Sequence, residues 1–159
     1  PLYETTPANY AEYHALMSKM ENEVTDMHKR VNTLFGKQKQ LEDLLTSLPS
    51  DTKNEALRKQ GDTLLKQLKA WDEDMVQRKS KAYDDVENFP NKFTANYLFL
   101  MNQTESSIPR VNQPNVDRLS ELNKEWAGLK SRSDDLLEKQ IPAFNQLLWD
   151  AGIGPIWKK

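Results

Sequence analysis

The chain has no cysteine among its 159 residues, which excludes disulfide bonds and metal sites built from thiolates. Histidine is almost as scarce, and only His14 and His28 are present. Neither histidine has a glutamate three residues before it, as the di-iron sites of helical bundles require. We therefore predict no metal and no cofactor, and we interpret both histidines as residues of a helix surface.

Long apolar runs and a strong charge of one sign are also missing. The longest apolar run, residues 97–101, is far shorter than the roughly 20 apolar residues that cross a bilayer. The formal net charge is only −2 at pH 7, so the chain lacks the basic excess that is typical of nucleic-acid binding. We predict no membrane span and no nucleic-acid partner.

Groups for catalysis are equally sparse. Only five glycines are present, and they form no glycine-rich phosphate loop. The adjacent acidic residues at 84–85 and 134–135 are candidates for acid–base chemistry. Neighbouring residues on a helix point about 100° apart, so such pairs do not converge on one substrate atom. We interpret them as parts of a solvated face and predict no catalytic residue.

The first third of the chain contains a regular apolar pattern. Its apolar residues recur at alternating intervals of three and four positions. This seam consists of Tyr10, Tyr13, Met17, Met20, Val24, Met27, Val31, Leu34, Leu41, Leu45 and Leu48. Only Gln38 interrupts it. The spacing keeps one stripe of a long helix facing partner helices. A charged fraction of 29% and a mean hydropathy of −0.82 fit helices with narrow apolar stripes and wide solvated faces.

Capping residues and prolines divide the chain into four expected helices. Their ranges are 7 to about 48, about 52 to 89, 91 to about 104, and about 114 to 151. The third range is apolar nearly all round, so we expect it to be the most buried element. Pro142 is expected to kink the fourth helix, and Gly152 is placed to cap its end.

These features predict an all-α fold. We expect an elongated antiparallel up-down-up-down helical bundle with three long helices, one short helix and an extended proline-containing connector over residues 105–115. The bundle is expected to form a single domain over residues 1–159, with terminal segments at 1–6 and 152–159. Because the chain begins with Pro1, we expect it to be part of a longer protein. We predict a monomer or a weak dimer.

Two segments carry apolar residues that an isolated bundle does not need. The connector contains Ile108, Arg110 and Val111, and the C-terminal tail contains Ile153, Ile156 and Trp157. The connector is interpreted either as a loop tethered for stability or as a binding loop. The tail is expected to dock either on the base of the bundle or on a neighbouring domain. These six residues are the candidate interaction residues.

Three segments carry a resemblance to a known family, together with the long helical hairpin. They are residues 88–93 (NFPNKF), the connector at 108–114, and residues 136–153, which include Phe144-Asn145 and Gly152-Ile153. In this order they resemble the all-helical C-terminal region of large bacterial proteins whose main body is a sortilin-like (BNR-repeat) β-propeller, often labelled glycosyl hydrolases. The resemblance implies a neighbouring β-propeller domain as partner and a location in the cell envelope or outside the cell. It also implies that any sugar chemistry belongs to the propeller.

The predicted function is therefore a non-catalytic structural or interaction module, the C-terminal helical domain of a larger exported β-propeller protein. Its partner would be that propeller domain or another protein. The alternative is a spectrin-like or adaptor-type helical rod that mediates protein–protein interaction. A cofactor-bearing enzyme bundle is disfavoured by the two histidines. A lipid-binding bundle is disfavoured because the polar faces mix charges of both signs.

Overall fold

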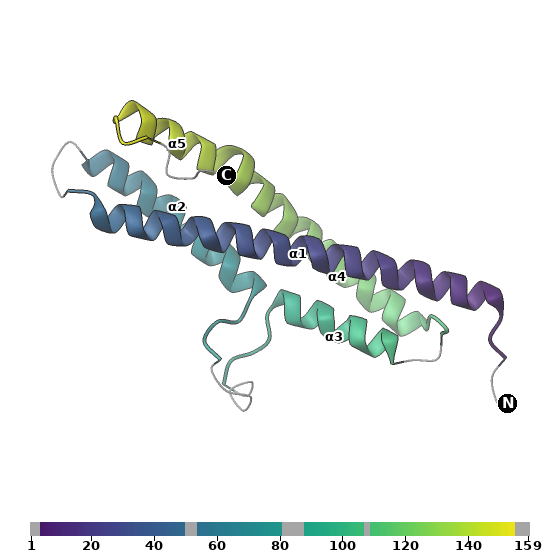
Figure 1. Ribbon diagram of the computed structural model, residues 1–159. Helices are drawn as coiled ribbons and strands as arrows, with labels where there is room; N and C mark the ends of the chain where they lie inside the picture. The colour runs from purple at the N-terminus through teal and green to yellow at the C-terminus, as the bar shows by residue number, and fades with distance from the viewer. Residues whose placement is uncertain (1–3, 50–53, 81–87, 107–108, 155–159) are drawn as a thin grey trace. The chain divides into compact units, whose positions relative to one another are not determined.

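A computed structural model describes residues 4–49, 54–80, 88–106 and 109–154. Every regular element within these ranges is helical, so the predicted all-α helical bundle is confirmed. The elements in chain order are α1 (Pro7–Ser47), α2 (Glu55–Met75), α3 (Phe93–Glu105), α4 (Gln113–Asp135), the π-helix η2 (Leu136–Gln140) and α5 (Ile141–Asp150) (Figure 1).

The helices form two compact units. Unit 1 contains residues 1–29 and 75–128, and unit 2 contains residues 30–74 and 129–159. Helices α1 and α4 each contribute a segment to both units. Helix α3 belongs to unit 1, whereas α2 up to Asp74 and all of η2 and α5 belong to unit 2. Unit 1 therefore packs α3 with segments of α1 and α4, and unit 2 packs α2 with a segment of α1 and the chain from α4 through η2 to α5.

Helix α1 begins and ends where its sequence pattern predicts. Its start is fixed by a reciprocal cap, because the Thr6 N–H donates to Oδ1 of Asn9 (3.0 Å) and the Asn9 N–H donates to Oγ1 of Thr6 (3.3 Å). Most of the seam is buried, namely Met17, Met20, Met27, Val31, Leu34, Leu41, Leu45 and Leu48. Tyr10 is 51% exposed, so the first turns of the seam take little part in the core.

Unit 1 is built around an antiparallel pair of helices, α3 and α4. Three contacts fix their register: the Asn115 amide donates to Oγ1 of Thr104 (3.1 Å), the Tyr97 hydroxyl donates to Oδ1 of Asn123 (3.2 Å), and the rings of Phe93 and Trp126 stack at 5.9 Å. Later residues of α3 thus meet earlier residues of α4. The α1 segment closes the unit through Glu23, which accepts a hydrogen bond from Trp126.

Unit 2 joins the rest of α1, most of α2 and the chain from Leu129 onward. A buried hydrogen bond from Nε1 of Trp71 to the Leu129 carbonyl (2.8 Å) links α2 to α4. The ammonium of Lys69 pairs with the Glu42 carboxylate (2.9 Å) and links α2 to α1. The Arg30 guanidinium pairs with Asp134 and links α1 to α4. Helices α1 and α2 form an antiparallel hairpin (Figure 1).

Helix α2 ends at Met75, so the prediction that it extends to residue 89 is wrong. Residues 76–80 are not helical, and none of them is buried. The apolar seam ends here because Arg78 occupies the next seam position and is exposed. The freed backbone is held locally, since the Lys79 N–H donates to Oε1 of Gln77 (2.9 Å). The expected helical residues 81–87 lie outside the described residues.

Helix α3 has the largest share of buried residues among the described helices, 5 of 13, as expected, but it is not buried all round. One face is buried, formed by Phe93, Thr94, Tyr97, Leu100 and Thr104. The opposite face is solvated, and Phe99 on that face is 64% exposed beside the exposed Asn96 and Asn102. The reason is that unit 1 gives α3 two helical neighbours, which cover only part of its circumference. The connector to α4 is also shorter than predicted, since α4 already begins at Gln113.

The predicted disturbance near Pro142 takes the form of the π-helix η2. Pro142 has no N–H for an intrahelical bond, and its ring crowds the carbonyl four residues earlier. The Ile141 N–H instead donates to the Leu136 carbonyl, the wider spacing of a π-turn. At the end of α5, Gly152 adopts a φ of 75° and the Ile153 N–H donates to the Leu148 carbonyl (3.0 Å). This Schellman motif confirms Gly152 as the cap.

Candidate functional site

The predicted interaction residues do not converge on one site. Arg110 is exposed and Val111 half-buried in unit 1, whereas Ile153 is 38% exposed in unit 2. Ile153 has a local structural role, because its N–H completes the cap of α5. Ile108, Ile156 and Trp157 lie outside the described residues. Their proposed roles in binding stay predictions.

The histidines are surface residues, as the sequence predicts: His14 and His28 are both exposed on α1. Within the described ranges, no group of three or more His, Cys, Asp or Glu side chains is placed to hold a metal ion. No described helix combines the length and apolar character needed to cross a membrane.

A concave surface lies on unit 2, between α2 and the chain running from α4 through η2 to α5. It consists of two hollows of about 540 and 430 Å³, and Gln67 lines both. On the α2 side the groove is lined by one face of the helix, which carries Ala56, Gln60, Thr63, Gln67 and Ala70. We call this surface the α2–α5 groove.

One end of the α2–α5 groove is largely apolar. Leu64 and Phe144 are buried beneath it, and Ala143 and Leu147 form the α5 side. Of the described residues that line this end, Lys59 alone is charged. The backbone beneath is close-packed, because a Cβ added at Gly61 would lie 2.6 Å from Cδ2 of Leu45.

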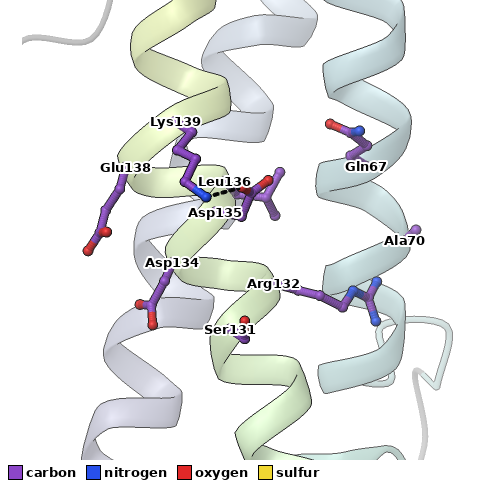
Figure 2. Close-up of a pocket in the computed structure, with 9 residues that line it drawn as sticks. All are labelled: Gln67, Ala70, Ser131, Arg132, Asp134, Asp135, Leu136, Glu138 and Lys139. Carbon is purple, nitrogen blue, oxygen red and sulfur yellow. Dashed lines mark ion pairs between the residues drawn. The ribbon is translucent and has the colours of Figure 1, made fainter.

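The other end of the groove is polar and lies over η2 (Figure 2). Lys139 pairs with Asp135 (3.2 Å), and Arg132 extends toward α2 and pairs with Asp74 (2.6 Å). Glu138 projects from the side of η2 that faces away from Gln67 and Ala70 (Figure 2). The acidic residues of this end outnumber the basic ones.

Asp135 is the carboxylate at the polar end whose ionised form is favoured by its neighbours. A hydrogen bond from the Gln140 amide (3.1 Å) and then the Lys139 ammonium lower the pKa of Asp135. General acid catalysis needs a carboxyl whose pKa is raised toward neutrality, usually by burial. The groove is open to solvent, and its cations Arg132 and Lys139 form ion pairs with Asp74 and Asp135.

Sequence reasoning missed this groove. Its signal is a set of small side chains, Ala56, Ala70 and Ala143, at positions where larger residues would fill the space between two helices. These residues lie on helices far apart in the sequence. Only the register between α2 and α5 brings them to one surface, and a pattern along one helix does not contain that register.

No protein-family model, no curated protein and no solved structure matches this chain.

Proposed function

We propose that this chain is a non-catalytic helical module that binds and braces another protein domain. The single observation that carries the proposal is the α2–α5 groove, a hollowed and open surface where Arg132 pairs with Asp74 and Lys139 pairs with Asp135. Surfaces that combine apolar and polar parts in this way are typical of protein–protein contacts.

The electrostatics support a role in binding over one in chemistry. Arg30, Arg132 and Lys139 each pair with a neighbouring aspartate around η2. Such pairs fix the position of helices and set the charge pattern of a surface, which favours selection of a partner. Hydrolysis of an aryl glycoside by the isolated chain, lost on Asp135→Asn substitution, would contradict the non-catalytic role.

The proposed partner follows from the resemblance described above. We propose that the module is the C-terminal helical domain of a larger exported protein, next to a sortilin-like β-propeller that would carry any glycosyl hydrolase activity. The reading frame that encodes the chain tests this part. Propeller repeats upstream would support it, whereas tandem helical repeats would favour a spectrin-like rod.

Hydrogen–deuterium exchange tests the binding role itself. The chain is compared alone and mixed with the separately produced neighbouring domain of its reading frame. We expect slower exchange of amides in one surface region of the chain when the neighbour is present. Identical exchange in both samples, at concentrations that saturate a micromolar complex, would contradict the proposed role.

A further inference from the structure

The chain that follows α2 carries two adjacent basic residues, Arg78 and Lys79, outside any helix. Both are exposed, between the half-buried Gln77 and Ser80. Exposed non-helical segments are preferred sites of proteolysis, and trypsin-like endoproteases bind a basic side chain in an acidic pocket. We propose that residues 77–80 are a processing site for such a protease, and that cleavage there leaves a two-chain protein with both units intact. This inference goes beyond the proposed binding role and does not depend on it.

The other basic residues of the described ranges are less accessible to a protease. Most lie within helices, where an endoprotease reaches the backbone only after local unfolding. The two others outside helices are Lys92 and Arg110. Lys92 is half-buried, and its carbonyl accepts a hydrogen bond from the Asn96 N–H (3.1 Å) in the first turn of α3. Two residues after Arg110, Asn112 caps α4 by accepting from the Asn115 N–H (2.9 Å).

The proposed site itself is held by hydrogen bonds that water can replace. The side-chain amide of Gln77 donates to the Pro90 carbonyl (3.3 Å), and its Oε1 accepts from the Lys79 N–H (2.9 Å). Both bonds are exposed, so losing them costs little when the segment extends across a protease active site. Hydrolysis after Lys79 consumes one water molecule. The Lys79 carbonyl carbon becomes a carboxylate, and the Ser80 nitrogen becomes an ammonium group.

Cleavage divides the chain so that both products contribute to unit 1. The first product, residues 1–79, supplies residues 1–29 and 75–79, and the second supplies residues 80–128. Two hydrogen bonds of unit 1 then join the products. Trp126 donates to the Glu23 carboxylate (2.6 Å), and the Thr94 hydroxyl donates a buried bond to the Met75 carbonyl (2.8 Å). Neither bond depends on the segment that is cut.

Unit 2 is shared between the products in the same way. Its residues 30–74 belong to the first product and its residues 129–159 to the second. The buried hydrogen bond from Trp71 to the Leu129 carbonyl (2.8 Å) and the ion pair of Arg132 with Asp74 (2.6 Å) both join the two products. The cut removes only the covalent link that keeps the halves at high effective concentration. We therefore expect the products to stay assembled.

Limited digestion of the full 159-residue chain tests the site. The chain is treated with a small amount of trypsin in native buffer, and the earliest products are identified by intact mass. We expect the first cut after Arg78 or Lys79. The two products should elute together in native size-exclusion chromatography and keep the helical circular dichroism of the uncut chain. In urea the same two products should elute separately.

A double variant, Arg78→Gln with Lys79→Gln, tests the two residues. We expect its first cleavage to be at least about tenfold slower than that of the wild type. Both side chains are exposed, so the fold should be retained, as circular dichroism checks. Arg110→Gln is the matched control, because Arg110 is also exposed and outside a helix. Its digestion should follow the wild type.

Four results would overturn the inference. Resistance of the wild type, or a first cut within a helix or after Arg110, would show that the segment is not the site. Undiminished cleavage of the double variant, for example after residue 81, would show that the two basic residues do not determine it. Separation of the products at micromolar concentration in native buffer would show that the contacts within the two units do not hold a two-chain protein together.

Discussion

The indole Nε1–H of Trp126 donates a 2.6 Å hydrogen bond to a carboxylate oxygen of Glu23, joining α4 to α1 within unit 1. Trp126 is buried and stacks on Phe93, which in turn lies 6.0 Å from the Tyr97 ring. The carboxylate therefore sits at the edge of an aromatic cluster. A negative charge beside a buried phenol opposes ionisation of that phenol.

Tyr97 is expected to make the protein sensitive to alkali. Burial, and then the charge of Glu23, raise the pKa of Tyr97 from 10.0 to about 12. Below pH 10 the phenol is neutral in both the folded and the unfolded chain. Between pH 10 and about 12 only the unfolded chain loses this proton, so the free energy of unfolding falls as pH rises. Urea denaturation at pH 8 to 11.5 measures the slope.

The Tyr97→Phe variant is the control for that slope. It should be less stable near neutral pH, because it loses the hydrogen bond to Asn123, yet its stability should fall less steeply above pH 10. Glu23→Gln should lower the pKa of Tyr97 only in part, since burial is the larger cause. If the free energy of unfolding falls equally steeply above pH 10 in wild type and Tyr97→Phe, another group controls the loss of stability in alkali.

Glu42 should govern part of the acid response of unit 2. Its carboxylate accepts from Lys39 and Lys69, which lower its pKa from 4.5 to about 2. A lowered pKa in the folded chain stabilises the fold above pH 4.5, and that stabilisation is lost as pH falls toward 2. All three side chains are partly exposed, so we expect a loss of only about 0.5–1 kcal/mol.

The Glu42→Gln variant separates this effect from general acid denaturation. Its stability should fall about 0.5–1 kcal/mol less than that of the wild type between pH 5 and pH 2.5. Asp43→Asn is the matched control, because Asp43 is the next residue on α1 and is exposed. If both variants change the loss of stability at acid pH equally, Lys39 and Lys69 do not lower the pKa of Glu42 as the geometry implies.

The seam of α1 could be predicted because its information is local. Each apolar residue recurs after three or four positions, and Pro49 marks the end. The spacing predicts too late an end for α2, because Ala82 and Phe89 continue it beyond Met75 although Arg78 interrupts it. A helix with a charged residue in its apolar seam gains little stability from packing at that position. Tertiary contacts then decide whether the helix continues beyond it.

Exposure and hollows could not be predicted from spacing. Phe99 is apolar and helical, yet its exposure depends on how many helices surround α3. The α2–α5 groove depends on Ala56 and Ala143 meeting across two helices that are far apart in the chain. Both features are properties of a register between elements, which the sequence of one element does not encode.

Gly61 should tolerate no side chain without cost. A Cβ at this position would lie 2.6 Å from Cδ2 of Leu45 and 3.1 Å from Cζ of Phe144, and both of those side chains are buried. Overpacking typically costs about 1–3 kcal/mol, whereas alanine gains about 1 kcal/mol over glycine in a helix. Because Leu45 can shift its terminal methyl, we expect Gly61→Ala to lower the free energy of unfolding by about 1 kcal/mol.

Two other helical glycines are matched controls for Gly61. A Cβ at Gly36 or Gly128 meets nothing within 4 Å, and both residues are exposed within helices. Gly36→Ala and Gly128→Ala should each raise the free energy of unfolding by about 0.5–1 kcal/mol. Urea denaturation of all three variants checks the sign. Stabilisation by Gly61→Ala equal to that of the controls would show that α2 does not approach α1 and α5 so closely.

Gln38, the polar residue in the seam of α1, should make the folded protein less stable than an apolar residue at this position would. It is buried, its amide donates a long 3.4 Å bond to Glu42, and its Oε1 finds no hydrogen-bond partner among the described residues. A buried polar group without a partner costs about 1–3 kcal/mol. Methionine has the same unbranched length without that group, so Gln38→Met should raise the free energy of unfolding by about 1–2 kcal/mol.

The exposed Gln40, two residues along α1, gives the matched control for this substitution. Gln40→Met should change stability by less than about 0.5 kcal/mol, because its side chain is solvated in both states. Single buried polar residues in coiled-coil seams can fix the register between helices. If Gln38 has that role, Gln38→Met should unfold at higher urea but over a broader transition. A loss of stability in Gln38→Met would instead mean that Oε1 is hydrogen-bonded in the folded protein.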